Sequence, residues 1–573
     1  MKSLEKIFFS IKDKKFQIVV LFILTILMSI LEITGIGLVG GYIGFIASSD
    51  FSGISQIKKI LSIFGEFNDR QTTINFLGIL ILSILFFRFI LKVLSNFFIL
   101  KITAIAKSDL LIKLTKIFLQ MSYLDYSKRD SAEFYNSVTN YCDQFSNSLI
   151  ASLKLFNSII FLLAIVIFLV IVDLYSFLIL SSLIILLLAL NKFFFSKEFR
   201  SLGLNLNFNV EKIFKNLKEG LTGLKEIRIL NKTGYFFNII KKSSLGIANN
   251  SIKYNTINDS FRDLIEFALG AIIIFLVIFI TNFHSSEYSL SIITIFGIAG
   301  IRSLPLISNS ITSLNTMTYS QNAINTIYNY LNMKASSEKM DTSEKIYNVD
   351  SFNTLDLEGI SFSYSKNLSI LSKVNLKVVK GDIIGIVGDS GSGKTTLVDI
   401  ITGLLEANDG FIKYNGKKLN YEEIIMLRNK IAYLPQQSFI FNDTIKNNIA
   451  FNIDDKKINV NKIHESIKAA GISDFINNLP EKLNYILGEH GGKISGGQKQ
   501  RISLARAFYN EKEIMILDEF TSSLDEVKEN EIMETIKKLS ASKTFIIVSH
   551  KKSTLKFCNK IFEIKSGRLE KLN

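Results

Sequence analysis

The stretch Gly388-Asp389-Ser390-Gly391-Ser392-Gly393-Lys394-Thr395-Thr396 lies between an apolar, β-branched run at 382–387 and a helical pattern at 395–405. It fits Gly-x-x-x-x-Gly-Lys-Ser/Thr without a mismatch. Glycines let the backbone wrap closely around phosphates, and the following helix N-terminus adds a partial positive charge. We expect Lys394 to contact the β- and γ-phosphates of a nucleotide and the Thr395 hydroxyl to ligate Mg²⁺. This strand, loop and helix predict an α/β fold of the P-loop type.

A second group of polar residues follows about 120 positions later. The apolar run Ile514-Met515-Ile516-Leu517 reads as a buried strand, and it ends in Asp518 and Glu519. We expect Asp518 to hold Mg²⁺ through water. Glu519 is the candidate catalytic carboxylate, because hydrolysis needs a group that polarises water beside the γ-phosphate.

Between these two groups lies Ile494-Ser495-Gly496-Gly497-Gln498-Lys499-Gln500-Arg501. The Ser-Gly-Gly run opens a helical pattern, so its bare backbone donors would suit an anion. The chain alone does not say which phosphate this helix N-terminus would meet.

The first 310 or so residues have a different composition from the rest. Of the 573 residues, 48% are hydrophobic and 20% charged, with a mean hydropathy of +0.30. Long apolar runs concentrate in the first half. A bilayer-spanning helix needs about 20 mainly apolar residues. Six stretches qualify as spans: Gln17–Ala47, Thr73–Leu100, Leu149–Val172, Ser176–Leu190, Leu264–Ile280 and Leu290–Ile307.

The charge of the chain supports a membrane location. The net charge of +15 could indicate a nucleic-acid partner, but Lys and Arg crowd the segments that flank the apolar spans. We therefore predict a lipid bilayer and no nucleic acid. The segments Lys101–Ser148 and Asn191–Ser260 are amphipathic and carry many Lys and Arg, whereas the alternate connections at 48–71, 173–175 and 282–288 carry few. They therefore predict long helices in the cytoplasm, on the same side as the N-terminus.

Two connecting segments have their own patterns. In Ser48–Gln71 the apolar residues fall on one helical face, which fits either a helix packed on the spans or an interfacial helix that touches lipid-like cargo. Residues 331–353 are polar and lack long apolar periodicity. We predict a transmembrane domain at 1–330, a linker at 331–353 and a soluble domain at 354–573.

With these motifs in order, residues 354–573 resemble the nucleotide-binding domain of ATP-binding cassette (ABC) transporters. The resemblance implies that Tyr364 stacks on adenine. It implies that Gln436, in Tyr433-Leu434-Pro435-Gln436, contacts Mg²⁺ and senses the transmembrane domain. It also implies that His550 touches the γ-phosphate, which makes Glu519, His550 and Gln436 the catalytic set. Departures from the family pattern are Ile494, Ser523 and Lys551.

The same resemblance implies a second copy of the chain. In the family, the signature Ser495, Gly496, Gly497 and Gln498 closes over ATP that the phosphate loop of the other subunit holds. Asp525 ends the loop that links the two sites, and Glu489 contacts the cytoplasmic helix ends. One chain supplies one phosphate loop and one signature, so a homodimer is expected. By position, short helices near Leu124–Glu133 and Lys218–Leu224 would couple the two domains.

Six spans followed by such a domain predict an α-helical six-span transmembrane domain of the ABC exporter type with an α/β P-loop ATPase domain. The protein is expected to be a multi-pass protein of the bacterial inner membrane, with its ATPase domain in the cytoplasm. ATP and Mg²⁺ are the implied cofactors.

The cargo is suggested by charged groups in or near the spans. Arg suits phosphate because its planar fork can donate two hydrogen bonds. Short matches around Arg88, Arg262 and Arg302 resemble the PglK-type lipid-linked oligosaccharide flippases, which translocate a polyprenyl-pyrophosphate glycan, although a further arginine expected in that pattern is Ser310 here. Salt bridges or snorkelling at helix ends remain an alternative for these arginines. The alternative functions are an exporter of peptide, lipid or drug and a non-transporting ATP-gated regulator.

Overall fold

The computed structural model describes residues 2–9, 14–47, 70–172, 174–283, 286–333, 350–365, 368–451, 453–522 and 524–572. Contacts between residues divide the chain into two compact units. The first unit comprises Met1–Leu119 and Lys128–Lys334, and the second comprises Gln120–Ser127 and Ala335–Asn573.

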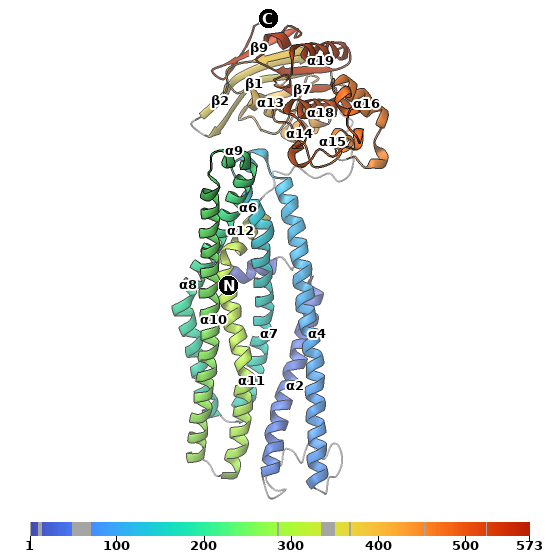
Figure 1. Ribbon diagram of the computed structural model, residues 1–573. Coiled ribbons are helices and arrows are strands. Elements are labelled where there is room, and N and C mark those ends of the chain that lie inside the picture. Colours follow the sequence, from blue (N-terminus) through green and yellow to red (C-terminus); the bar gives the residue numbers. More distant parts are fainter. Residues whose placement is uncertain are drawn as a thin grey trace. The chain divides into compact units, whose positions relative to one another are not determined.

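The first unit is made of helices. They are α1 (Lys2–Phe9), α2 (Lys15–Ala47), α4 (Arg70–Leu119), α6 (Ser131–Asn136), a π-helical turn η3 (Ser137–Tyr141), α7 (Cys142–Val172), α8 (Leu174–Thr222), α9 (Leu224–Ile229), α10 (Thr233–Phe283), α11 (Ser286–Tyr319) and α12 (Gln321–Asn332). The long helices run side by side, and α8 packs on α10, α7 on α11, and α2 on α4 (Figure 1).

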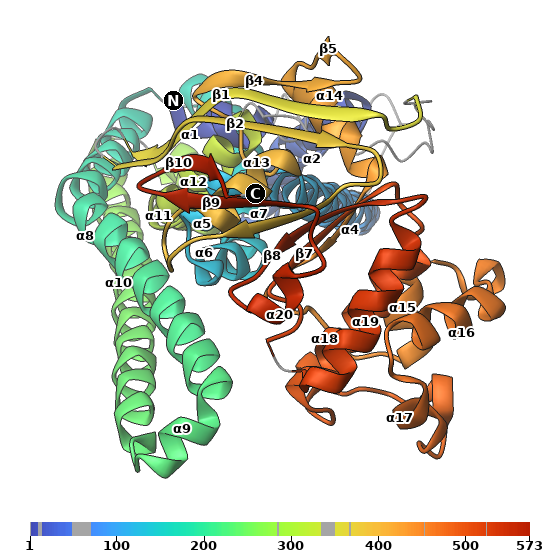
Figure 2. The same ribbon diagram turned by 90° about the horizontal axis from the view of Figure 1, so that it is seen from above.

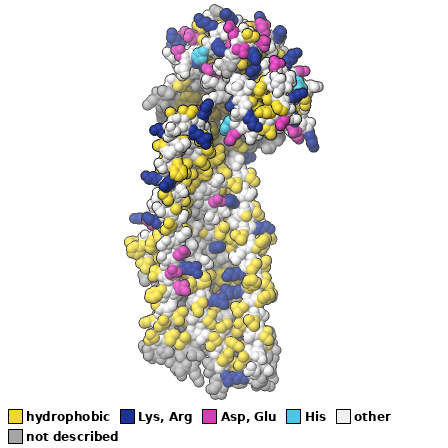
Figure 3. Space-filling view, viewed as in Figure 1, with side chains coloured by type: hydrophobic (Ala, Val, Ile, Leu, Met, Phe, Trp, Pro, Cys, Tyr) yellow, Lys and Arg dark blue, Asp and Glu magenta, His cyan; other side chains and the backbone are white. Residues whose placement is uncertain are grey.

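Each predicted span lies inside one long helix. The helices α2, α4, α7, α8, α10 and α11 contain them in chain order. Within the described residues, Lys15–Ile43, Arg70–Leu119 and Ser131–Val172 are long and apolar enough to cross a membrane by length and composition. An α-helix satisfies its own backbone hydrogen bonds, which is the requirement for a segment in lipid. Figure 3 shows hydrophobic side chains over much of the visible face of these helices.

The helices extend beyond the predicted spans, as the amphipathic patterns of their flanks indicate. α4 continues to Leu119, and α8 continues to Thr222. The two predicted coupling regions differ in detail from the structure. The first contains α5 (Tyr123–Ser127) and the start of α6, whereas the second coincides with the end of α8, and the short helix α9 begins only after Gly223. The predicted outer helix within 48–71 lies outside the described residues, except for its last two positions.

The second unit contains two sheets. The four-stranded antiparallel sheet has the order β2-β1-β4-β5, and the six-stranded sheet has the order β10-β9-β3-β8-β7-β6, in which only β10 is antiparallel to its neighbour. The strands are β1 (Thr354–Ser365), β2 (Leu368–Val379), β3 (Ile383–Val387), β4 (Asp409–Tyr414), β5 (Lys417–Lys418), β6 (Ile431–Leu434), β7 (Ile514–Asp518), β8 (Thr544–Val548), β9 (Lys560–Lys565) and β10 (Arg568–Lys571).

The second unit also contains helices. They are α5, α13 (Lys394–Ile401), α14 (Tyr421–Leu427), α15 (Ile445–Ala450), α16 (Val460–Ala469), α17 (Ser473–Asn477), α18 (Gly496–Tyr509), α19 (Glu526–Leu539) and α20 (Lys552–Leu555), with 3₁₀ turns at Arg428–Lys430, Asp455–Lys457, Lys482–Asn484 and Glu489–Gly491. Figure 2 shows α15, α16 and α17 grouped away from the antiparallel sheet.

The apolar core of this unit explains the runs seen in the sequence. Strands β3, β7 and β8 are buried on both faces, which is why each reads as a continuous apolar run. Leu124 of α5 packs against the cluster that contains Ile384 and Ile516. Of the predicted linker, residues 334–349 lie outside the described part, and α12 continues to Asn332, two positions into the predicted linker range.

Candidate functional site

The phosphate loop joins β3 to α13 and needs glycine at fixed positions. Gly388, Gly391 and Gly393 have φ angles of +148°, +79° and +108°, which residues with a side chain rarely adopt. A Cβ atom at Gly388 would lie 2.5 Å from the carbonyl oxygen of Ile564. The strand, loop and helix predicted from the motif are therefore present, with α13 beginning at Lys394.

Lys394 is the first residue of α13, and its side chain contacts the phosphate loop that precedes it. Its side chain is buried, and Nζ donates to the carbonyl oxygens of Gly388 at 2.7 Å and Asp389 at 2.9 Å. The buried hydroxyl of Ser392 has no hydrogen-bond partner within the described residues. A cation held by uncharged carbonyls and a buried hydroxyl without a partner both suit an anionic ligand with acceptor oxygens.

The acidic pair lies at the end of β7, as predicted. Asp518 is buried, and burial, together with the neighbouring Glu519, raises the pKa of its carboxyl to about 6, while Lys394 opposes this rise. Glu519 is a non-glycine residue with a φ of +48°, and its N–H donates to the carbonyl oxygen of Val548 at 2.9 Å. A strained backbone that is held in place by a neighbouring strand often marks a functional position.

Two further predicted residues converge on Glu519. Gln436 Nε2 donates to Glu519 Oε2 at 2.6 Å. His550 Nε2 lies 3.6 Å from Glu519 Oε1, close enough for an ion pair when the imidazole is protonated. Gln436 follows β6, Glu519 follows β7 and His550 follows β8, so the carboxyl ends of three neighbouring parallel strands bring these groups together.

The family signature opens α18. Ser495 is the N-cap of this helix, and its hydroxyl accepts from the N–H of Gln498, whose side chain accepts from the N–H of Ser495 in return. This capping box explains why Ser495 and Gln498 occur at this spacing. The predicted contact of this segment with a nucleotide remains a prediction.

The remaining residues predicted for the nucleotide site make few contacts within the described residues. Tyr364 is 39% exposed, which leaves its ring accessible, and its hydroxyl lies 3.4 Å from Thr396 Oγ1. Asp525 caps α19 by accepting from the N–H of Lys528 at 2.9 Å. Glu489 is exposed, and Ser523 lies outside the described residues.

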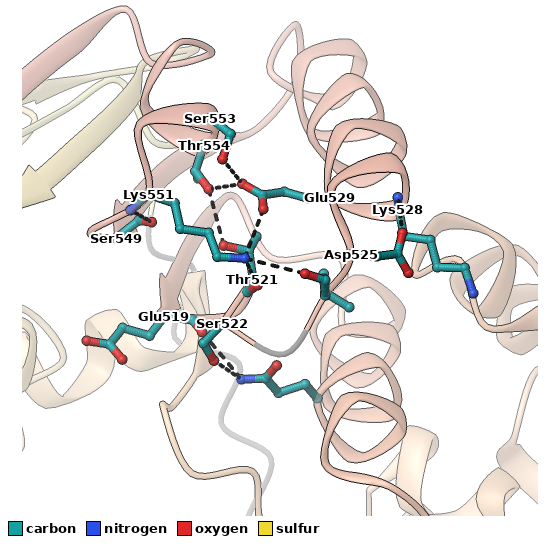
Figure 4. A network of polar contacts seen from close by, with 12 residues as sticks. Glu519, Thr521, Ser522, Asp525, Lys528, Glu529, Ser549, Lys551, Ser553 and Thr554 are labelled. Atoms are coloured by element: carbon teal, nitrogen blue, oxygen red, sulfur yellow. Dashed lines mark hydrogen bonds and ion pairs between the residues drawn. The ribbon is translucent and has the colours of Figure 1, made fainter.

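Lys551 has a defined role in the structure. Its Nζ donates to the carbonyl oxygen of Thr521 at 2.6 Å and to Glu529 Oε2 at 3.1 Å (Figure 4). Glu529 on α19 is only 2% exposed, and it also accepts from Ser553 and Thr554 at 2.7 and 2.5 Å. This buried network joins the segment after Glu519 to the segment that carries His550.

The sequence reasoning missed Glu529, although a signal was present. Glu529 occupies the same helical face as the buried Ile532, Met533 and Ile536. A carboxylate on an apolar helix face requires a partner, so a cation elsewhere in the unit could have been expected. Gln500 was also missed as a contact of this region, and its Nε2 donates to Ser522 Oγ at 3.1 Å.

The residues present fit Mg²⁺ only together with a phosphate ligand. Within the described residues, no group of three or more His, Cys, Asp or Glu side chains could hold a metal ion. Mg²⁺ usually takes one or two protein ligands and fills its remaining positions with phosphate oxygens and water. Asp518, the exposed Thr395 and Gln436 provide such a partial set. When bound, the ion would neutralise charge on the phosphates.

The three arginines predicted to meet cargo separate into two kinds. Arg88 Nε forms an ion pair with Glu32, and Arg302 Nε lies 3.6 Å from the other oxygen of the same carboxylate. Arg262 is exposed and forms no ion pair within the described residues. Ser310, where the resemblance implies a further arginine, is buried and donates to the carbonyl oxygen of Leu306 in its own helix.

Comparisons with known proteins agree with this architecture. The family model for the ABC transporter domain matches residues 371–522, and the model for the ABC transporter transmembrane region matches residues 45–299. Together they match more than half of the chain. The chain therefore belongs to the ABC transporters and joins a transmembrane region to an ABC ATPase domain.

Individual relatives carry several names. The chain is 40% identical over 38% of its length to an ATP-dependent lipid A-core flippase of Desulfotalea psychrophila and matches 37% of that protein. It is 32% identical over 61% of its length to the lactococcin-G-processing and transport protein LagD of Lactococcus lactis and matches 50% of it. The chain thus spans about half or less of the length of these relatives.

A solved structure shows the same fold. A bacterial Atm1-family ABC exporter with ATP bound aligns over 97% of this chain and 94% of its own length, with a TM-score of 0.80 and 17% identity. The class of fold is accordingly that of the ABC exporters.

Proposed function

We propose that this protein hydrolyses ATP to move a lipid-linked substrate across the bacterial inner membrane, as a homodimer. The observation that carries the proposal is the convergence of Gln436 and His550 on Glu519, directly after the buried Asp518 and in the same domain as the phosphate loop. In this proposal Glu519 orients and polarises the attacking water, while Lys394 and the loop N–H groups hold the phosphates. The second subunit supplies Ser495–Gln498 to each site.

The orientation of the chain is part of this proposal. Lys and Arg are frequent in the helical extensions that follow the spans in α4 and α8 and precede the span in α10, which favours a cytoplasmic location for these extensions and for the N-terminus. The ATPase domain would then lie where ATP is available.

The test replaces Glu519 by Gln. The amide keeps the shape of the side chain but removes its basicity, so ATP hydrolysis should fall about 100-fold or more while ATP binding is retained. Glu531→Gln is the matched control, because Glu531 is exposed on α19 and lies outside the site. Hydrolysis by the Glu519→Gln variant at the rate of the control would overturn the assignment of the catalytic carboxylate.

The cargo we propose is a polyprenyl-pyrophosphate oligosaccharide. The support is the resemblance around Arg88, Arg262 and Arg302, together with the flippase name of one relative. The name of LagD favours a peptide as the second candidate cargo. Purified protein in vesicles, supplied with either cargo on the ATP side, should translocate the lipid-linked glycan and show stimulated ATP hydrolysis. If neither cargo changes hydrolysis, the ATP-gated regulator becomes the better function.

A further inference from the structure

A cluster of three charges lies among the long helices, and its members come from three of them. Glu32 is on α2, Arg88 on α4 and Arg302 on α11. The carboxylate is the most buried of the three, with 4% of its side chain exposed, against 21% for Arg88 and 40% for Arg302. Each oxygen of Glu32 faces a different arginine.

The two arginines are not held equally. Arg88 is in direct contact with Glu32, whereas the Arg302 Nε to Glu32 Oε1 distance of 3.6 Å is longer than a hydrogen bond. Arg302 retains donors that its carboxylate partner does not use.

The charges of the cluster do not cancel. Two guanidinium groups and one carboxylate leave a net charge of +1 in a region of low dielectric constant, where an uncompensated charge is costly. One further anionic group would neutralise it. A guanidinium fork receives a phosphate in the same bidentate manner as a carboxylate.

The surroundings of the cluster select the kind of anion. The neighbours of Arg88 along α4 include Phe86, Phe87 and Phe89, each more than 60% exposed. Residues one or two positions apart on a helix do not share a face, so these rings lie around α4 at the level of Arg88. An amphipathic molecule with its headgroup at the arginines would thus find apolar side chains at the same depth for its chain.

We propose that Glu32 is a built-in counter-ion that occupies the arginines until an anionic lipid headgroup takes its place, first at the loosely held Arg302. This inference rests on the proposed transport function and specifies the substrate class as an amphipathic molecule with a phosphate or similar anionic headgroup. Glu32 competes with the substrate and so sets its affinity. Release of the headgroup becomes easier because the carboxylate is already in place to pair with the arginines again.

The test measures binding at equilibrium and does not depend on ATP hydrolysis. The full chain in neutral detergent is titrated with phosphatidic acid, with phosphatidylcholine and with inorganic phosphate, and thermal unfolding reports binding. Glu32→Gln removes the competing charge but keeps the shape of the side chain. We expect phosphatidic acid to stabilise this variant at a concentration at least tenfold lower than the wild type requires, with no such difference for phosphatidylcholine.

Two controls make the result specific. Glu266→Gln neutralises an exposed carboxylate on α10 and should leave the phosphatidic acid titration unchanged. Adding Arg302→Gln to Glu32→Gln should abolish the gain. Inorganic phosphate can also bind to the phosphate loop of the ATPase domain. The binding at the arginines is therefore measured as the difference between Glu32→Gln and wild type. If Glu32→Gln differs from wild type with phosphatidic acid but not with inorganic phosphate, the site binds a lipid headgroup. If the two proteins differ only with inorganic phosphate, the site binds the free anion and the proposed lipid ligand is wrong.

The inference is overturned if Glu32→Gln and wild type respond to phosphatidic acid at the same concentration, since Glu32 would then be only a structural ion-pair partner. If the Gln variant does not fold, Glu32→Asp serves instead. Its shorter carboxylate retains the charge but retreats from Arg302, and it should bind phosphatidic acid several-fold more tightly than wild type. Loss of the proposed function would show separately, as absent ATP hydrolysis with lipid binding intact.

Discussion

Glu529 in the ATPase unit and Glu32 among the long helices are both almost fully buried, with 2% and 4% exposure, yet they are held differently. Glu529 accepts from Lys551, Ser553 and Thr554, all of which lie within four residues of one another in the chain (Figure 4). Glu32 has two arginines from two other helices, one close and one at 3.6 Å.

This difference teaches what each carboxylate can do. A buried charge with three donors from one short segment is fully satisfied, so it fixes the position of that segment. A buried charge that is shared between two cations on separate helices can exchange one of them when the helices or the ligand change. The first arrangement suits a rigid catalytic domain, and the second suits a binding surface that must release its ligand.

The largest expected effect is at Glu529. Glu529→Leu would remove the buried carboxylate that accepts from Lys551, Ser553 and Thr554, whereas Lys551 itself is 36% exposed. Losing three hydrogen bonds to a buried carboxylate at once costs about 3–5 kcal/mol of unfolding free energy. Urea unfolding of the full chain in detergent, followed by hydrogen exchange in α19, measures this cost. Glu531→Leu, on the exposed face of the same helix, should lose less than 1 kcal/mol, and an equal loss in both variants would break the comparison.

Asp399 is a third buried carboxylate and, unlike Glu529 and Glu32, it has no ion-pair partner within the described residues. Burial, together with the nearby Asp518, raises the pKa of its carboxyl to about 6. The folded state thus binds a proton more tightly than the unfolded state, and stability falls as the pH rises through the interval from the ordinary aspartate value to about 6.

We therefore expect Asp399→Asn to stabilise the nucleotide-free protein at pH 7.5, by up to about 3 kcal/mol, and to have little effect near pH 4. Thermal unfolding of both proteins across this pH range tests the sign. If the stability difference between Asp399→Asn and wild type is the same at both pH values, ionisation of the buried Asp399 carboxyl does not destabilise the folded protein.

A smaller effect, on the rate of ATP hydrolysis, is expected at Lys551. This side chain holds other parts of the site in position and does not contact the nucleotide. Lys551→Ala frees the segment around Thr521 from the segment that carries His550, so kcat for ATP should fall about tenfold, which corresponds to about 1.4 kcal/mol. The KM for ATP should change less than about twofold, because the phosphate loop is untouched. Lys551→Arg keeps the cation and should retain kcat. An unchanged KM in Lys551→Ala distinguishes a loss of positioning from a general loss of folding, which would lower the fraction of active protein and the urea midpoint together.

The smallest effect is expected where an ion pair faces water. Lys417 and Glu423 are 73% and 30% exposed and 2.7 Å apart, and the exposed pair should contribute about 0.5 kcal/mol or less. Lys417→Ala should therefore leave the urea midpoint nearly unchanged. A loss comparable to that of Glu529→Leu would mean that exposure is a poor guide to the energy of an ion pair in this domain.

Much of the fold and of the nucleotide site could be predicted, because the features that specify them are local. The glycines of 388–393 adopt φ angles that other residues avoid, so the motif and the loop geometry go together. The run 514–518 is apolar throughout because β7 is buried on both faces. The capping box of Ser495 and Gln498 spans three residues. The segment Lys218–Leu224, for which a short separate helix was predicted, was less predictable, because α8 continues to Thr222 and the short helix α9 begins only at Leu224.

The pairing of buried charges belongs to the tertiary structure. Glu32, Arg88 and Arg302 are separated by long stretches of chain, and only the packing of α2 with α4 and α11 brings them to one place. Lys551 could be recognised in the sequence as a departure from the family pattern, but its contact with Glu529 could not. Backbone preferences act between near neighbours and can be read in order along the chain. The energy of a charge depends on which distant groups surround it after the chain has folded.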